Sequence, residues 1–175
     1  MGRPWIAFFS QTGSEIVDLA NELDRWPDAI ITNYRPDNIR EVNKNLHHYI
    51  EVPNRPSLVE IKDILKKYDN PLITLHGWLR IMPPEICEGY EIYNGHPGLI
   101  TLYPELKGKD PQVRAWEAKH SLAGAVLHKV VEGVDEGNVI SIDGFSTDGL
   151  DKNEFFRILK YKSKWLWVDF LKDKI

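Results

Sequence analysis

The stretch "PLITLHGWLRIMPPEICEGYEIYNGHPGLI", residues 71–100, contains two short apolar runs that favour β-strands, "PLITLH" and "EIYN". Each run is followed by Gly and Pro residues, which stop a strand and turn the chain. The segment "PPEICEG" between them is compatible with a short helix. Strand, helix and strand in this order predict a crossover unit of a parallel sheet, and therefore an α/β domain.

The same alternation extends outward from this stretch in both directions. Before it, strand-like runs occupy residues 4–10, 29–33 and 49–52, and segments with apolar residues at helical spacing occupy 15–23, 37–46 and 57–68. After it, we expect a short helix at 112–118, two strands at 124–131 and 138–145 that pair antiparallel, and a long closing helix at 151–171. This pattern predicts a Rossmann-like, mostly parallel twisted sheet with flanking helices, in a single domain spanning residues 1–175.

The composition excludes several classes of protein. The chain has 175 residues, 42% of them hydrophobic, and a formal net charge of -4. It therefore has enough apolar residues for a core, and no basic field that would favour nucleic-acid binding. No apolar run approaches the ~20 residues of a membrane span. Cys87 is the single cysteine, so a disulfide within the chain is impossible, and we expect a cytoplasmic protein. Its oligomeric state cannot be read from the sequence.

Asn94 and His96 lie at the end of the strand-like run that includes "EIYN" (residues 91–94) and are separated by Gly95. Because residues i and i+2 of a strand share a face, the amide and the imidazole can point to the same place. Ligands of open parallel sheets bind at the carboxyl ends of the strands, where this pair lies. The alternative is a strand-to-loop turn in which both side chains satisfy only local backbone groups, and these residues leave both interpretations open.

Two further polar segments reach the same edge of the predicted sheet. The turn "QTGSE" (residues 11–15) precedes a helix, with Ser14 as the expected N-cap, and is either an anion site or a simple capped turn. Asp135 lies in the polar turn "GVDEGNVI". An Asn, a His and an Asp suit acyl-type transfer, in which an oxyanion needs hydrogen-bond donors and a proton must move. We expect no metal, because the six His residues show no ligand spacing.

Four segments in this order resemble the folate-dependent formyltransferases, the family that includes the catalytic domains of phosphoribosylglycinamide and methionyl-tRNA formyltransferases. These segments are "FFSQTGSE", "GWLRIMPPEI", "YNGHPGLI" and "GAVLHKVVEGVDEGNVI". The most specific features are Asn-x-His-Pro and the later Asp-x-Gly turn. The resemblance implies that Asn94, His96 and Asp135 are the catalytic residues, and that His128 lies just behind them.

The resemblance also implies binding residues. For the donor, 10-formyltetrahydrofolate, these are Gly137 and a segment that borders the pterin mainly through backbone atoms, namely Leu79, Arg80, Ile81 and Met82. The Arg80 side chain either serves structurally or pairs with an anionic group of a ligand, and both interpretations remain open. For the second substrate, the implied binding residues are Gly13, Ser14 and Arg55. Glu15 stands where the purine enzyme has an uncharged residue, and its carboxylate would repel a bound phosphate unless it pointed away.

The implied reaction is attack by the amine of a small substrate, such as a nucleotide or an amino sugar, on the formyl group of 10-formyltetrahydrofolate. The chain would then be a folate-dependent N-formyltransferase. The same Asn, His and Asp would also suit attack by water in place of the amine. A 10-formyltetrahydrofolate hydrolase that releases formate is therefore the alternative. If the chain were a non-catalytic folate- or nucleotide-binding module, we would expect at least one of the three residues to be lost, and all three are present.

Overall fold

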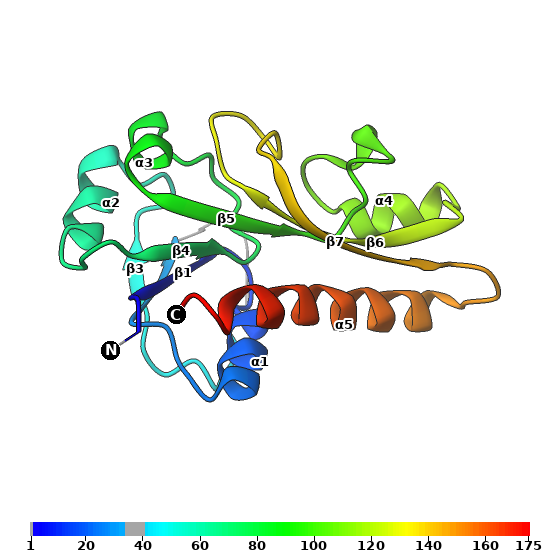
Figure 1. Cartoon of the computed structure of the whole chain (residues 1–175), viewed down its shortest axis with the longest axis horizontal. Coiled ribbons are helices and arrows are strands. Elements are labelled where there is room, and N and C mark those ends of the chain that lie inside the picture. The colour runs from blue at the N-terminus through cyan, green and yellow to red at the C-terminus, as the bar shows by residue number, and fades with distance from the viewer. Residues whose placement is uncertain (1, 34–40) are drawn as a thin grey trace.

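The computed structural model describes residues 2–33 and 41–175, and in this part of the chain seven strands form one sheet in the order β3-β2-β1-β4-β5-β6-β7 (Figure 1). The strands are β1 (Trp5–Phe9), β2 (Ala29–Asn33), β3 (Ile50–Val52), β4 (Leu72–Leu75), β5 (Glu91–His96), β6 (Leu122–Lys129) and β7 (Val139–Ser146). The first five run parallel, β6 pairs antiparallel with β5, and β7 pairs antiparallel with β6. The predicted mostly parallel α/β sheet with a closing antiparallel pair is confirmed.

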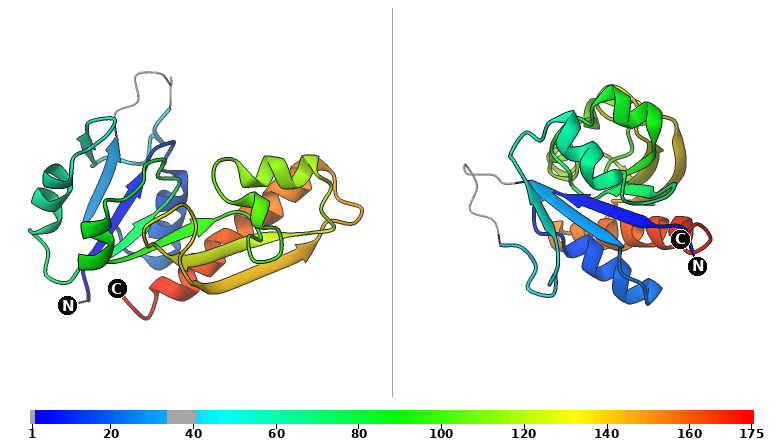
Figure 2. Two further views of the ribbon diagram at one scale, coloured as in Figure 1. Left: turned by 90° about the horizontal axis from the view of Figure 1, so that it is seen from above. Right: turned by 90° about the vertical axis from the view of Figure 1, so that its left-hand side faces the viewer.

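Helices cover both faces of the sheet (Figure 2). One face carries α1 (Ser14–Leu23) and α5 (Lys152–Leu171), and the other carries α2 (Leu58–Leu65) and α3 (Pro84–Gly89). The short η1 (Pro104–Leu106) and α4 (Pro111–Glu117) lie near β6, at the end of the molecule away from α2 (Figure 1). None of the helices in the described part of the chain has the length and apolar character needed to traverse a lipid bilayer.

The alternation of side chains along β1 divides the core into two layers. Trp5, Ala7 and Phe9 pack in the cluster that includes α1 and α5, whereas Ile6 and Phe8 pack in the cluster that includes α2 and α3. All five side chains are fully buried. A strand that is buried on both faces must be apolar throughout, which explains the uninterrupted run in this part of the sequence.

Two local expectations on the α1 side of the sheet are wrong. Gly13, with φ +72°, is the N-cap of α1, and Ser14 is its first residue. The Ser14 hydroxyl does not cap the helix, because it accepts hydrogen bonds from Thr12 Oγ1 and Asn43 Nδ2, both at 3.0 Å. Of the helix expected at 37–46, residues 37–40 lie outside the described residues, and residues 41–46 form no helix but irregular chain with a turn at 44–45. There the Asn43 N–H donates to the Thr12 carbonyl, which holds the segment against the α1 turn.

The sheet brings the chemically interesting segments together at one edge. The carboxyl ends of β1, β4 and β5 are neighbours, since β4 pairs with both β1 and β5. The chain that follows β4 is tied back to the end of β1 by a hydrogen bond from the Ser10 N–H to the Gly77 carbonyl. Polar residues after these strands therefore line one region, as expected for an open parallel sheet.

Candidate active site

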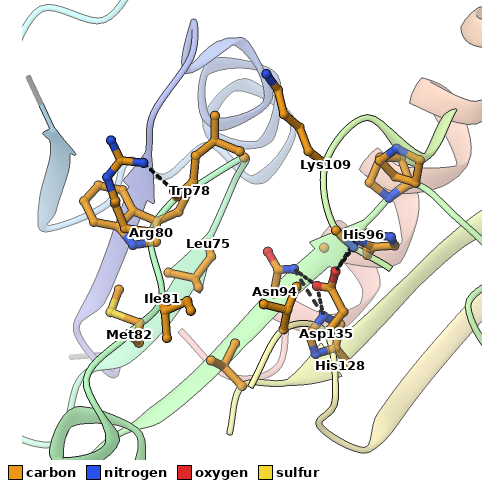
Figure 3. A pocket seen from close by; sticks show the side chains of 18 of the residues that line it. Leu75, Trp78, Arg80, Ile81, Met82, Asn94, His96, Lys109, His128 and Asp135 are labelled. Atoms are coloured by element: carbon orange, nitrogen blue, oxygen red, sulfur yellow. Dashed lines mark hydrogen bonds and ion pairs between the residues drawn. The ribbon is translucent and has the colours of Figure 1, made fainter. Parts of the chain in front are cut away.

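Asn94 and His96 project from the carboxyl end of β5 toward one carboxylate (Figure 3). Asn94 Nδ2 lies 3.2 Å from Asp135 Oδ1, and His96 Nδ1 lies 3.3 Å from Asp135 Oδ2. The two side chains thus share one partner, which lies 41 residues beyond Asn94 in the sequence. Their contacts are therefore not confined to the local backbone. The i, i+2 spacing on a strand explains why both reach the same carboxylate.

Asp135 lies in the turn between β6 and β7, where its backbone has a φ of +52°. This left-handed conformation is uncommon for residues other than glycine, although Asp tolerates it better than most. In it the carboxylate turns inward: Oδ2 accepts a 2.8 Å hydrogen bond from the Gly108 N–H, and Oδ1 lies 3.2 Å from His128 Nε2. The Asp135 side chain is only 9% exposed, so these neighbours replace water around its charge.

The electrostatics of this cluster favour an ionised Asp135 beside a less basic His96. Burial acts to raise the pKa of Asp135, but the hydrogen bond from His128, the charge of His96 and the Gly108 N–H together hold that pKa below its ordinary value. Burial lowers the pKa of His96, and the opposing effects of Asp135 and the Leu106 carbonyl do not cancel this lowering. A carboxylate that stays ionised next to an imidazole of lowered pKa is a combination suited to proton transfer.

Both ring nitrogens of His96 face acceptors in this structure. Nδ1 faces Asp135, and Nε2 lies 2.8 Å from the carbonyl oxygen of Leu106. An imidazole between two acceptors can stabilise an oxyanion only after one of these contacts is exchanged for the substrate oxygen. The predicted oxyanion role of His96 therefore requires a small rearrangement of the ring or of the Leu106 segment.

A pocket of about 410 Å³ opens beside this cluster. Figure 3 shows the polar groups Asn94, His96, Asp135 and His128 on one side and the side chains of the 78–82 segment on the other. Ile81, 68% exposed, and Val134, 47% exposed, line the pocket and would be covered by a ligand. An apolar wall that faces a few converging polar groups is typical of a small-molecule site.

Trp78 forms part of the apolar wall and is held edge-on against Phe8, with ring centroids 5.2 Å apart. Its side chain is buried, yet the indole Nε1 has no hydrogen-bond partner within residues 2–33 and 41–175. A buried donor without a partner is costly in a folded protein and is often explained by a bound water or ligand.

The Arg80 side chain lines the pocket but forms its hydrogen bonds with other residues of the protein. Its Nε donates to the Asn54 carbonyl at 2.8 Å, another guanidinium nitrogen donates to the Asn54 side chain, and Nη1 donates to the Leu79 carbonyl at 2.9 Å. The Leu79 N–H in turn donates to Ser10 Oγ at 2.9 Å. These bonds anchor the 78–82 segment to neighbouring loops, which favours the structural interpretation of the Arg80 side chain.

The other residues that the resemblance implicated in binding lie outside the lining of this pocket. Gly13 and Ser14 form the α1 turn, and Arg55 is exposed and makes no hydrogen bond or ion pair with the described residues. Gly137 passes so close to β6 that an added Cβ atom would lie 1.5 Å from the Lys129 carbonyl oxygen. That contact gives a steric reason for the glycine, and the binding roles of all four residues stay predictions.

Glu15 points away from the α1 turn and toward the protein. Its Oε1 lies 2.7 Å from His76 Nδ1, and its Oε2 accepts a 3.0 Å hydrogen bond from Ser163 Oγ. Burial acts to raise the pKa of Glu15, but these partners outweigh it and leave the pKa below its ordinary value. The carboxylate is therefore an internal anion with its own partners and is not presented to a ligand of the turn.

Sequence reasoning did not identify several residues that line the pocket. Lys109 and Val134 lie on loops at its mouth, and Gln11 reaches it from the end of β1. Loop residues of this kind carry no periodicity, so only their position beside a recognised motif could have indicated them. No group of three or more His, Cys, Asp or Glu side chains in the described ranges is arranged to hold a metal ion.

Comparison with known proteins identifies relatives of this chain. The profile of a family described as formyl transferase matches residues 29–150, which include the cluster around Asp135. A phosphoribosylglycinamide formyltransferase of Bacillus subtilis is 32% identical over 105 residues, 58% of this chain and 52% of the relative. A formyltetrahydrofolate deformylase of the same organism is 28% identical over 153 residues, 82% of this chain and 46% of the relative. The chain thus spans about half the length of these curated relatives.

The fold is also found in solved structures. The crystal structure of phosphoribosylglycinamide formyltransferase from Anaplasma phagocytophilum superposes with a TM-score of 0.82 over 98% of this chain and 86% of the other, at 22% sequence identity. Identity at this level establishes a shared fold, and the family profile adds sequence patterns over most of the sheet and the loops of the candidate site. On these grounds the chain belongs to the formyl transferase family.

Proposed function

We propose that this chain transfers a formyl group from 10-formyltetrahydrofolate to the amine of a small substrate. The observation that carries the proposal is the Asp135 carboxylate, which lies within 3.3 Å of polar atoms of Asn94, His96 and His128 beside a pocket with an apolar wall. Formyl transfer needs donors for an oxyanion and a group that moves a proton, and this cluster contains both.

The roles follow from the chemistry of each side chain. The amine nitrogen bonds to the formyl carbon, and the carbonyl oxygen becomes an oxyanion that accepts an N–H of Asn94. His96 donates to the same oxygen once its contact with the Leu106 carbonyl is exchanged. Ionised Asp135 accepts the proton that the amine loses, through a water molecule, while the bond from carbon to N10 of the folate breaks. That proton ends on N10, so charge and atoms balance.

The apolar wall supports a folate as the donor. A pterin is a flat ring system, and Trp78, Ile81 and Met82 supply apolar surface along one side of the pocket. The segment that carries them is fixed by the Arg80 and Leu79 hydrogen bonds. A wall that is already rigid binds a flat ligand at a lower entropic cost than a mobile loop does.

The acceptor is proposed as a small amine of the nucleotide or amino-sugar class. A phosphate on such an acceptor would be bound by Gly13 and Ser14, with Arg55 contributing charge. In this structure the Ser14 N–H lies 3.3 Å from Thr12 Oγ1, and its hydroxyl is held by Asn43. A phosphate at the turn would therefore have to displace these internal contacts, which favours acceptors that do not depend on one.

Hydrolysis of 10-formyltetrahydrofolate is the second candidate. It is favoured by the similarity to the Bacillus subtilis formyltetrahydrofolate deformylase, which extends over 82% of this chain, compared with 58% for the formyltransferase of that organism. In this reaction water replaces the amine, Asp135 accepts its proton and formate is released. Asn94 and His96 would stabilise the same kind of oxyanion in both reactions.

A turnover assay separates the two reactions. Purified protein is mixed with 10-formyltetrahydrofolate, and release of tetrahydrofolate is followed with and without amines that carry or lack a phosphate. Release that depends on an amine, with formyl recovered on that amine by mass spectrometry, supports the transferase. Release in water alone, with stoichiometric formate, supports the hydrolase. Absence of both, when the folate still binds in a calorimetric titration, would contradict both activities for the amines tested and water.

A further inference from the structure

One short loop contacts both members of the His96–Asp135 pair. The Leu106 carbonyl accepts a hydrogen bond from His96 Nε2 at 2.8 Å, and two residues later the Gly108 N–H donates to Asp135 Oδ2 at 2.8 Å. The backbone therefore offers an acceptor to the imidazole and a donor to the carboxylate. Displacement of this loop would change the surroundings of both groups at the same time.

The side chain of Arg114, in α4, contacts four of the five residues of this loop, 105–109. Its guanidinium donates to four backbone carbonyls: Nε to Lys109 at 3.0 Å, Nη2 to Lys107 at 2.8 Å and to Leu106 at 3.1 Å, and Nη1 to Glu105. The planar, forked guanidinium, with five N–H donors, suits such a set of acceptors, and an ammonium group does not.

The Leu106 carbonyl is the point where these two sets of contacts meet. It accepts from Arg114 Nη2 and from His96 Nε2, so the arginine and the imidazole share one oxygen. Arg114 itself does not line the pocket. Its influence on the site therefore passes through the loop and through its positive charge, which acts to lower the pKa of His96, and not through contact with a ligand.

Apart from Arg114, the loop is held by its contacts with the site, by turn bonds such as that from the Leu106 N–H to the Tyr103 carbonyl, and by an ion pair of Glu105 with His120 at 3.2 Å. Gly108 and Asp110 both have positive φ values, +88° and +50°, and the second of these is uncommon for a residue other than glycine, although Asp tolerates it better than most. The side chains of Lys107 and Lys109 are exposed, whereas Leu106 is buried and anchors the start of the loop. An exposed loop with strained backbone is expected to become mobile when its carbonyl contacts are removed.

We propose that Arg114 is a positioning residue, which holds residues 105–109 against His96 and Asp135 and so fixes the orientation of the imidazole and the carboxylate. The structural part of this inference depends only on the contacts of Arg114, and its effect on rate rests on the proposed function. The wall at residues 78–82 is anchored through Arg80 and Ser10 instead. Gly108 and Lys109 also line the pocket, so binding of the folate is expected to depend on Arg114 much less than turnover does.

The first test observes His96 directly in the protein without substrates. Protein with ¹⁵N-labelled histidine is prepared as wild type, Arg114→Ala, Arg114→Lys and Arg157→Ala, and the His96 signals are assigned from their loss in His96→Gln. Arg157 is an exposed residue of α5 and serves as the matched control. We expect the His96 Nε2 signal to shift, and its proton to exchange faster with solvent, in both Arg114 variants and not in the control.

The second test measures turnover. We expect kcat to fall roughly 10²-fold in Arg114→Ala, the size of effect that a misplacement of about 1 Å causes in catalytic groups, with the KM for the folate changed less than about twofold. Arg114→Lys keeps the positive charge but lacks the forked geometry, so it should recover little of the rate. Added guanidinium ion should restore part of the activity of Arg114→Ala and none in Arg157→Ala.

The outcomes separate this inference from the proposed function. Unchanged His96 signals in both Arg114 variants would overturn the positioning role, whatever the reaction. Shifted signals with an unchanged kcat would overturn its importance for catalysis. A wild-type protein without turnover would defeat the proposed function, and the NMR comparison would still decide whether Arg114 orients His96. If Arg114→Ala does not fold, Arg114→Lys, which keeps the charge and the aliphatic stem, provides both readouts.

Discussion

His128 Nε2 lies 3.2 Å from Asp135 Oδ1, so the turn between β6 and β7 folds back on the strand that precedes it. The contact directs the carboxylate into the site, where its second oxygen faces His96 Nδ1. Asp135 is thus a bridge between two imidazoles that come from different strands. A side chain in this arrangement cannot change its charge without affecting both rings.

Asp135→Asn should lower kcat roughly 10²- to 10⁴-fold, the usual range for loss of a group that moves a proton. The amide is nearly the same size as the carboxylate, so the pocket keeps its shape and the affinity for the folate should change little. Steady-state kinetics and a folate titration measure the two effects separately. Asp148→Asn, at an exposed position outside the pocket, is the control. A defect in folate affinity with normal kcat would contradict the role given to Asp135.

Asn94→Ala should lower kcat roughly 10²- to 10³-fold, as expected when one donor to an oxyanion is removed. Asn94 Nδ2 also contacts His128 Nε2 at 3.1 Å, so its loss leaves that nitrogen and Asp135 with fewer partners. Asn153→Ala, an exposed change in α5, is the control for general effects of truncation. Turnover within a fewfold of wild type would show that Asn94 does not stabilise the transition state.

His96 should make the protein less stable in mild acid. Its pKa in the folded state is below the ordinary value of 6.5, so as pH falls through 6.5 the unfolded chain takes up a proton that the folded chain resists. The unfolded state is then favoured progressively until the pH reaches the lower, folded-state pKa. Urea unfolding at pH 7.5 and pH 5.5 should therefore show a smaller loss of stability for His96→Gln than for wild type. An equal or larger loss in the variant would contradict the lowered pKa.

Trp78 should report ligand binding. Its indole lines the pocket and is packed against Phe8, so a folate stacked near it should quench its fluorescence. The quench should disappear in Trp78→Phe and remain in Trp26→Phe, because Trp26 lies 44% exposed and outside the pocket. Titration with a stable folate analogue measures this without any turnover. If the quench survives in Trp78→Phe, the folate binds at a different part of the surface.

The parts of the site that sequence predicts best are those fixed by a local rule. Asn94 and His96 could be paired because alternate residues of a strand share a face, and the edge of the sheet followed from the order of strands and helices. Asp135 could be grouped with this pair from the expected position of its polar turn, and the family resemblance added its catalytic role. Its contacts could not be predicted, because a turn residue 41 positions from Asn94 follows no periodicity. The N-cap of α1 was misassigned because Ser14 is bound by Asn43, a contact that local spacing does not reveal.

Long-range contacts to backbone groups could not be predicted. Arg80 and Arg114 use their side chains on carbonyls of other segments, Asn54 in one case and residues 105–109 in the other. Every residue offers a carbonyl, so the sequence contains no sign of which one an arginine will bind. The same limit applies to Gly95, whose neighbour is the Trp167 side chain, more than seventy residues further along the chain.

Gly95 leaves no room for a side chain between the two proposed catalytic residues of β5. An added Cβ atom would lie 2.5 Å from Trp167 Nε1, and the indole is fully buried in the core. Gly95→Ala should therefore destabilise the protein by about 1–3 kcal/mol, the usual cost of overpacking. It should also lower kcat, because any shift of β5 that relieves the contact moves Asn94 and His96.

A double-mutant cycle with Trp167→Phe tests this cause. Phenylalanine lacks the Nε1 atom, so part of the cost of Gly95→Ala should vanish in the double variant, and the two effects on unfolding free energy should not add. Gly89→Ala is the control, because an added Cβ there meets no atom within 4 Å. Strict additivity of the two changes would mean that Trp167 does not limit the position of Gly95, and that the close approach of β5 to α5 does not set the geometry of the site.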